Sequence, residues 1–386
     1  MLASRWFAVG SASGLEREPG ARAADAALAR DDPKLLIVFC SHGLDLEALG
    51  AQIRRRAPDT PLVGCTTAGE IATTGPGDSS VVVAALGGEG FTVDTAVATG
   101  ASHDLRSAGA SVARCVPSPS DRPHRALLLL TDGLAGDQQE IVRGAYGVLG
   151  AGVPLVGGCA GDDLKMVSTF QLFDDRVLTD AVVAAGIASD APLGIGVRHG
   201  WRRVGEPMLV TRSGGNFVFE LDDRPALDAY LDRLGVGGSA PHDGEWFTRL
   251  ALTHPLGLGR RGGEEQVRFI GGADFDDRSL SCIAEVPQGG LVWIMEGDAE
   301  SVLTATDAAC SDSLTALGGS EPIGVLAFDC IARRGVLGDA RIGHEIERLA
   351  SMTSAPVAGF YTYGEIARTR GIHGFHNQTL VVLSIG

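Results

Sequence analysis

The chain has 386 residues, of which 45% are hydrophobic and 21% charged, and its formal net charge is −16. These values are typical of a folded globular protein of two or three domains and argue against disorder. Because an acid excess of this size opposes binding to a phosphate backbone, nucleic acid is excluded as a predicted partner.

Glycine, with 54 residues, is over-represented and predicts short strands joined by tight turns. Apolar runs stop well short of the ~20 residues that a membrane span needs, and the first 14 residues lack the apolar core of a signal peptide. The seven cysteines are odd in number and contain no CxxC pair. We therefore expect a cytoplasmic protein with reduced thiols and no membrane partner.

Three stretches of the chain repeat the same order of elements. An apolar run of strand length is followed by a polar residue and then by a stretch with helical spacing of its apolar positions. The predicted strands are 35–40, 126–130 and 323–328, and the predicted helices are 44–56, 137–149 and 339–352. A strand, a helix and a second strand normally form a right-handed crossover with parallel strands.

A sequence motif marks the start of the second strand in each repeat. Pro61-Leu-Val-Gly64 is followed after four residues by Gly69-Glu70-Ile71, and Pro356-Val-Ala-Gly359 is followed after four residues by Gly364-Glu365-Ile366. A shortened copy has Pro154-Leu-Val-Gly157, three residues, and then Gly161-Asp162. Three copies in one context indicate duplication.

We predict an α/β fold of two pseudo-equivalent halves, built from these strand–helix–strand units with mixed β-sheets. The halves divide near residue 200, which gives predicted domains at 30–200 and 201–386. Phe91–Thr99 with His103–Val116 is matched here to Gly290–Glu296 with Ala299–Leu317. The segment Trp201–Arg261 has no counterpart, so the duplication is not clean there.

Three segments carry a family resemblance. Val63-Gly-Cys-Thr-Thr-Ala-Gly-Glu-Ile71 resembles the signature of the N-terminal half of FIST domains, and Asn216–Leu234 resembles the opening of their C-terminal half. Phe360-Tyr-Thr-Tyr-Gly-Glu-Ile366, followed by His376-Asn-Gln-Thr379, resembles the close of that half. Together the matches cover nearly the whole chain from about residue 30.

The resemblance implies a non-catalytic sensory module that binds a small molecule. It also implies a separate signalling partner, such as a histidine kinase or a diguanylate cyclase, because this chain has no room for an output domain. Some members that stand alone are similar to haem proteins that sense nitric oxide. Haem is therefore the cofactor that the resemblance suggests, and a haem-based nitric oxide sensor is the first alternative function.

The predicted ligand site draws on the Gly-acid motifs and on the C-terminal motif. Strand-end residues of parallel sheets often line ligand sites, and the acids offer acceptors to an ammonium or amide donor. The alternative is that each glycine makes room for packing and each acid caps a neighbouring amide. The predicted ligand-binding residues are Cys65, Thr66, Thr67, Glu70, Cys159, Asp162, Tyr361, Tyr363, Glu365, His376 and Asn377.

Aromatic residues are scarce, yet Tyr361 and Tyr363 stand two apart in the last repeat. Alternate residues of a strand share a face, so both rings are expected on one wall. An aromatic wall with an acid suits an amino acid or a similar organic ligand. The alternative is one side of a core, with the hydroxyls reaching solvent.

A haem would need a proximal histidine in an apolar pocket. His376 is the first candidate because it lies in the family-like motif, and His42, at a strand end, is the second. His373 lies close to His376 in a glycine-rich turn. A lone histidine is more often a surface or hydrogen-bonded residue.

The second alternative function is a cysteine-dependent hydrolase or transferase. Cys40, Cys65 and Cys159 lie at or near strand ends, and Cys40-Ser-His42 brings a thiol close to an imidazole in sequence. A third, orienting group is not evident. The competing interpretation is that these cysteines are small packing residues.

Overall fold

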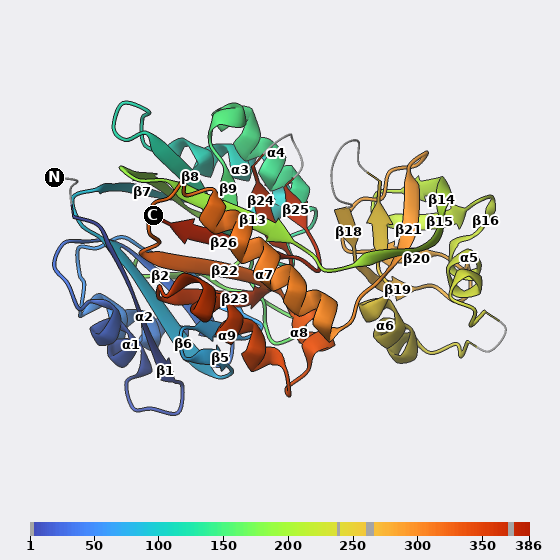
Figure 1. Cartoon of the computed structure of the whole chain (residues 1–386), viewed down its shortest axis with the longest axis horizontal. Coiled ribbons are helices and arrows are strands. Elements are labelled where there is room, and N and C mark those ends of the chain that lie inside the picture. The colour runs from blue at the N-terminus through green and yellow to red at the C-terminus, as the bar shows by residue number, and fades with distance from the viewer. Residues whose placement is uncertain (1–3, 238–239, 260–265, 370–373) are drawn as a thin grey trace.

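The computed structural model describes residues 4–237, 240–259, 266–369 and 374–386. A main body lies on the left of Figure 1 and a smaller lobe on the right. The main body contains three six-stranded sheets, and the lobe contains a further eight-stranded set. The predicted α/β class with mixed sheets is confirmed.

The first unit of the main body covers residues 6–87. Its helix α2 begins at Asp45, whose carboxylate accepts a hydrogen bond from the Ala48 amide, a standard N-cap. The elements are β1 (Trp6–Ser13), α1 (Pro19–Ala27), β2 (Pro33–Ser41), α2 (Leu46–Arg54), β3 (Leu62–Thr67), β4 (Glu70–Ala72), β5 (Gly75–Gly77) and β6 (Ser80–Gly87).

The second unit covers residues 91–189 and repeats this order. Its helix α4 is capped by Asp137, which accepts from the Gln139 amide. The elements are β7 (Phe91–Thr99), α3 (Leu105–Val112), β8 (His124–Thr131), α4 (Gln138–Leu149), β9 (Leu155–Cys159), β10 (Gln171–Phe173), β11 (Arg176–Leu178) and β12 (Ala181–Ser189), with short 3-10 turns at Ala101–His103, Ala113–Cys115 and Gly150–Gly152.

The third unit is interrupted after its first strand and resumes at residue 299. A capping box of Asp298 and Ser301 begins the helix at which it resumes. The elements are β13 (Leu193–Arg198), α7 (Ala299–Thr315), β22 (Gly324–Cys330), α8 (Ile331–Leu337), α9 (Ile342–Thr353), β23 (Val357–Thr362), β24 (Glu365–Arg368), β25 (Phe375–His376) and β26 (Leu380–Ile385).

The interruption forms the lobe, which has its own core around Tyr230 and Phe247. Its elements are β14 (Arg202–Gly214), β15 (Phe217–Leu221), β16 (Arg224–Pro225), α5 (Ala226–Arg233), α6 (Gly244–Thr253), β17 (Leu256–Leu258), β18 (Gln266–Arg268), β19 (Ile270–Ala273), β20 (Leu280–Cys282) and β21 (Leu291–Glu296).

One predicted correspondence is wrong. The strand at Gly290–Glu296 was matched to Phe91–Thr99, but β21 pairs with β14 and β17 inside the lobe. The strand equivalent to β7 is β13, because each lies at the edge of its sheet beside the last strand of its unit. The inserted lobe separates β13 from α7, which hides this relation in the sequence.

The three units exchange hairpins. The hairpin β4–β5 leaves the first unit and pairs with β23 of the third, and β10–β11 of the second unit pairs with β3 of the first. The hairpin β24–β25 of the third unit pairs with β9 of the second. The exchange therefore closes a ring of three units, in which every sheet contains strands of two units.

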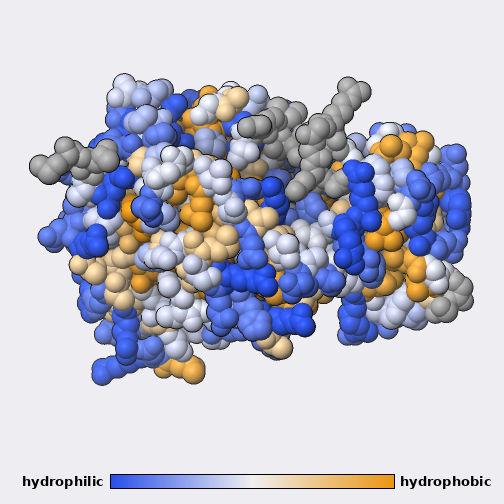
Figure 2. Space-filling view, viewed as in Figure 1, coloured by the Kyte–Doolittle hydropathy of each residue, from blue (hydrophilic) through white to orange (hydrophobic). Residues whose placement is uncertain are grey.

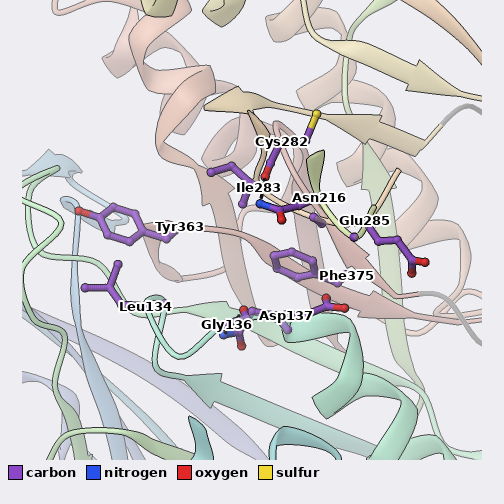
Figure 3. A pocket seen from close by; sticks show the side chains of 13 residues that line it. Leu134, Gly136, Asp137, Asn216, Cys282, Ile283, Glu285, Tyr363 and Phe375 are labelled. Carbon is purple, nitrogen blue, oxygen red and sulfur yellow. Dashed lines mark hydrogen bonds between the residues drawn. The ribbon is translucent and has the colours of Figure 1, made fainter. Parts of the chain in front are cut away.

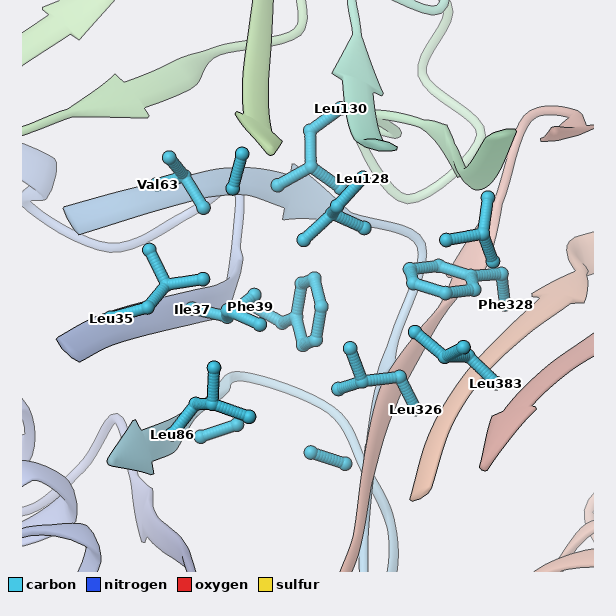
Figure 4. Packing of buried hydrophobic residues seen from close by; sticks show 14 of the residues in the cluster. Leu35, Ile37, Phe39, Val63, Leu86, Leu128, Leu130, Leu326, Phe328 and Leu383 are labelled. Carbon is cyan, nitrogen blue, oxygen red and sulfur yellow. The ribbon is translucent and has the colours of Figure 1, made fainter. Parts of the chain in front are cut away.

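A shared core fills the space between the inner faces of the three sheets. Alternate residues of β2 point to opposite faces, so Leu35, Ile37 and Phe39 enter this core while the residues between them pack beneath α1 and α2. Figure 4 shows Phe39 close to Phe328 of the third unit. Because both faces of the strand are buried, its sequence is continuously apolar rather than alternating.

Helices cover the outer face of each of the three six-stranded sheets. Figure 2 shows hydrophilic side chains along the lower edge of the main body and the outer edge of the lobe. Within the part of the chain that is described, no helix is both long and apolar enough to cross a bilayer.

The glycine of each Pro-x-x-Gly motif lies where two parallel strands come close. Gly64, Gly157 and Gly359 are in register with Val38, Leu129 and Ala327 of the neighbouring strand. A Cβ on Gly359 would lie 1.9 Å from the carbonyl oxygen of Ala327, and a Cβ on Gly157 equally close to that of Leu129. These glycines therefore have the packing role, since no side chain fits there.

We predict that Gly359→Ala lowers the free energy of unfolding by more than ~3 kcal/mol, because the new methyl overlaps backbone that cannot move aside. Urea denaturation measures the effect. Gly343→Ala, in helix α9 of the same unit with open space around the glycine, is the control. We expect the control to gain up to ~1 kcal/mol, and equal stability of the two variants would contradict the packing role.

Candidate functional site

The acid of the first motif, Glu70, is bound to its own unit. The hydroxyls of Ser41, Thr67 and Ser80 all donate to its carboxylate, which is completely buried. Burial raises the pKa of Glu70, and the three hydroxyl donors oppose that rise. Glu70 thus fixes the ends of β2 and β3 and the start of β6 at the point where the hairpin leaves.

Glu365 has the same place in the third unit. Its carboxylate accepts hydrogen bonds from the Thr362 hydroxyl and, at 3.1 Å, from the Thr379 amide. Burial raises the pKa of Glu365 to about 8, although these donors oppose the rise. The side chain is fully buried, and its partners are strand ends of the same unit.

Asp162, the acid of the shortened motif, holds a loop instead. Its carboxylate accepts from the amides of Met166, Val167 and Ser168 at 2.9, 2.7 and 3.0 Å, and from the hydroxyl of Tyr363. Burial opposes ionisation, but the hydroxyl and the three amides together lower the pKa of Asp162. The loop between β9 and β10 therefore wraps around one carboxylate.

The backbone of this loop is strained. Asp163, Leu164 and Met166 have φ values of 57°, 62° and 54°, in the left-handed region that costs residues with a side chain about 1 kcal/mol or more each. The Tyr363 hydroxyl also accepts from the amides of Leu164 and Asp162, at 2.7 and 3.2 Å. Tyr363 and Asp162 thus hold the loop in a conformation that it does not favour by itself.

A pocket of about 620 Å³ opens beside Tyr363, between the main body and the lobe. Figure 3 shows its walls: Leu134 and Asp137 from the segment before α4, Tyr363 and Phe375 from the third unit, and Asn216 with Ile283 from the lobe. The described residues that line it are Gly133, Leu134, Gly136, Asp137, Gln138, Gly215, Asn216, Cys282, Ile283, Ala284, Glu285, Tyr363 and Phe375.

Among the residues that the structure describes, the charged side chains that line this pocket are acidic. Asp137 and Glu285 are the charged residues of its lining, and Arg143 lies outside it, 3.6 Å from the Glu285 carboxylate. The Asn216 side-chain amide donates to the Cys282 carbonyl at 2.8 Å. The pocket therefore offers carboxylate acceptors beside the apolar surfaces of Phe375 and Ile283.

Among the eleven predicted ligand-binding residues, Tyr363 lines this pocket, and Glu70 lines a separate one of about 420 Å³. Thr66 is buried and accepts from the Phe170 amide at 3.0 Å, and Asn377 is buried with its carbonyl bound by Thr379. Cys65 belongs to the shared core, and Cys159 packs beneath α3 and α4 and accepts from the Thr131 hydroxyl.

Tyr361 belongs to a buried cluster against which Tyr363 packs, but of the two tyrosines it is Tyr363 that lines the pocket. Tyr361 is completely buried beneath α9, and Arg334 lies 5.2 Å from its ring centre. Its hydroxyl has no hydrogen-bond partner among the described residues. Nearby, Arg333 pairs with Asp329 and Glu345 at 2.6 Å, with all three side chains buried. Tyr361 therefore belongs to the buried region under the third unit's helices and does not line the pocket beside Tyr363.

The seven cysteines do not have the properties of nucleophiles. Burial is the largest influence on each, and it raises the pKa of every thiol, to about 12 for Cys159 and Cys282 and about 11 for Cys115 and Cys310. The pKa values of Cys40, Cys65 and Cys330 are raised further. An activated thiol needs the opposite change.

The described histidines do not fit a haem site at the pocket beside Tyr363. His376 Nε2 lies 2.9 Å from the Ala367 carbonyl oxygen, and the ring of His42 stacks on Phe170. Neither is in the lining of the pocket beside Tyr363. His373 lies outside the described residues.

Several pocket residues were not predicted from the sequence: Asp137, Asn216, Ile283, Glu285 and Phe375. The segments that carry them are up to 238 positions apart in the chain, counting from Asp137 to Phe375. The sequence does carry a signal for the loop next to the pocket. The motif that ends at Asp162 is one residue shorter than the other two and has aspartate where they have glutamate.

The architecture is that of a two-domain α/β protein with a pocket between its main body and its lobe. The FIST N domain matches residues 34–224 and the FIST C domain matches residues 226–368. The chain therefore belongs to the FIST family, whose domains are associated with sensory signal transduction and small-ligand binding. The lining of the pocket comes from both matched regions and from Phe375 beyond them.

Two relatives give no further assignment. An uncharacterized protein of Mycobacterium tuberculosis is 28% identical over 236 residues, which is 59% of this chain and 60% of the relative. An uncharacterized protein of Methanocaldococcus jannaschii is 26% identical over 156 residues, which is 38% of this chain and 30% of the relative. The aligned parts thus span less than two thirds of either relative.

We predict that Glu365 makes the protein less stable as the pH rises through about 8. A carboxyl whose pKa is raised on folding stabilises the fold below its unfolded pKa, and this contribution is lost as pH approaches the folded value. Between pH 5 and pH 8, the free energy of unfolding should fall by about 3–4 kcal/mol more in the wild type than in Glu365→Gln.

Chemical denaturation at several pH values measures this difference. Glu245→Gln, which changes an exposed acid of α6, is the control and should keep the wild-type pH dependence. Equal pH dependence of the wild type and Glu365→Gln would contradict a buried, neutral Glu365.

Proposed function

We propose that this protein is a cytoplasmic sensor that binds a small molecule in the pocket beside Tyr363 and signals through a separate protein. The partner class is a histidine kinase or an enzyme of cyclic-di-GMP metabolism. The observation that carries the proposal is the position of the pocket, which is lined by two segments of the lobe and three of the main body.

A ligand at such a junction can carry a signal. Because the walls belong to two bodies, the ligand's affinity depends on how the lobe and the main body are placed. A ligand that binds one arrangement more tightly shifts the population toward it. The two chain connections between the bodies, at residues 199–201 and 297–298, leave the lobe a compact unit with its own core.

The lining favours a ligand with a protonated amine and an apolar part. Asp137 and Glu285 supply the acceptors for the amine, and Phe375, Ile283 and the Tyr363 ring supply apolar surface. An ammonium beside aromatic rings gains further from the negative faces of those rings. A ligand whose charge is only negative would face these two carboxylates.

We predict that benzylamine binds more tightly than benzyl alcohol, and that benzoate binds more weakly than either. Isothermal titration calorimetry at pH 7 compares the three compounds, which share a ring and differ in charge. The double variant Asp137→Asn with Glu285→Gln should weaken benzylamine binding at least ~10-fold, since each charge-assisted hydrogen bond contributes roughly 1.5–3 kcal/mol.

Asparagine keeps the cap of α4, so the double variant is expected to fold. Glu245→Gln is the matched control and should leave binding unchanged. Equal affinity for all three compounds, or unchanged benzylamine binding in the double variant, would contradict the amine site.

A further inference from the structure

The loop between β9 and β10 carries exposed apolar side chains. Leu164, Met166 and Val167 have exposed fractions of 61%, 55% and 77%, although they are within five positions of the buried Asp162. The corresponding acids of the other two units, Glu70 and Glu365, begin a strand directly, so they have no such loop. This loop is thus a feature of the second unit alone among the three.

One hydroxyl of another unit binds Asp162 and Leu164 of this loop. The ends of the loop are also bound to the main body, because the Gly161 amide donates to the Thr66 carbonyl and the Thr169 hydroxyl donates to the Asp132 carboxylate. The Tyr363 hydroxyl donates to the Asp162 carboxylate and accepts from the amides of Asp162 and Leu164. It comes from the third unit, whereas the loop belongs to the second. Because three residues of the loop adopt left-handed backbone, these bonds oppose its relaxation to an ordinary conformation.

The other end of the same side chain faces the pocket. The Tyr363 ring lies in the pocket lining and packs on Gly133, where a Cβ would come within 3.1 Å of ring atom Cδ2. Tyr363 thus has its ring at the ligand site and its hydroxyl at the loop (Figure 3).

We propose that Tyr363 couples the pocket to the loop, so that a ligand packed against its ring holds the loop closed and an empty pocket releases it. The inference rests on the proposed function, because it uses the same pocket. Tyr363 is a positioning residue in this scheme. Ligand binding in the pocket changes how accessible residues 163–168 of the loop are.

The chain offers a specific reporter of this loop. It has two lysines, Lys34 and Lys165. Lys165 is exposed in the middle of the loop, whereas Lys34 is partly buried near the start of β2, a strand that lies between β3 and β6. A lysine-specific endoprotease therefore cleaves the folded protein at Lys165 when the loop opens and yields fragments 1–165 and 166–386.

We expect Tyr363→Phe to be cleaved at Lys165 at least ~10 times faster than the wild type, because it keeps the ring and loses the hydroxyl. Tyr361→Phe is the matched control: it removes a buried hydroxyl without a partner two residues away, and its cleavage rate should stay within twofold of the wild type. An unchanged rate in Tyr363→Phe would overturn the role of the hydroxyl.

The coupling to the pocket is tested with benzylamine at a concentration that saturates it by calorimetry. Cleavage of the wild type should slow at least ~5-fold, and cleavage of Tyr363→Phe should not respond although it still binds the amine. Binding without protection of the wild type would overturn the coupling. If benzylamine does not bind but Tyr363→Phe still opens the loop, the proposed ligand class fails while the hydroxyl's hold on the loop stands.

Discussion

The exchange of hairpins between units is the constraint on which the main body depends. Each sheet is complete only when a hairpin from another unit pairs with its second parallel strand. In all three sheets, the glycine of the Pro-x-x-Gly motif is in register with an apolar residue of the incoming hairpin, Leu172, Ile71 or Ile366. The glycine of the motif thus has the same place in every unit, between a parallel strand whose carbonyl it approaches closely and the incoming hairpin.

The pocket lies where this repetition fails. In the first and third units, the acid of the motif connects strand ends of its own unit, and hydroxyl groups donate hydrogen bonds to its carboxylate. In the second unit, the acid has moved one position closer to the strand and binds the amides of a longer loop. The third unit departs as well, by its inserted lobe. Tyr363, which binds the longer loop of the second unit, and segment 282–285 of the lobe both line the pocket. The pocket is therefore next to the two features that the three units do not share.

Much of the fold could be predicted from the sequence because its determinants are local. Buried strands with both faces covered are apolar without interruption, and the helices between them have clear N-caps at Asp45 and Asp137. The pairing of β13 could not be predicted in this way, because the lobe places about a hundred residues between it and α7. For this reason the sequence predicted β21, the strand just before α7, as the equivalent of β7 instead of β13.

The site was harder to predict because its chemistry depends on burial. Glu70 and Glu365 have the residue type of ligand acceptors, but hydroxyl and amide donors of their own unit already occupy them. Tyr361 and Tyr363 stand two apart, yet one ends beneath α9 and the other at the pocket. Asn216 and Glu285 gave no local signal, because they belong to the lobe and meet the body only through the tertiary fold.

The ring of exchanges also sets an order on how the chain can be completed during its synthesis. The hairpin β4–β5 emerges early, but its partner β23 begins about 285 residues later, where Thr73 bonds the backbone of Val357. Until then the first unit carries a hairpin without a sheet, and one edge of β4 has no partner strand. Long-range pairing of this kind slows folding and exposes strand edges to other chains. During synthesis, the strand edges of the first unit therefore stay available to other chains until the third unit is made. The shared core is complete only when strands from the first and the third unit have both packed into it.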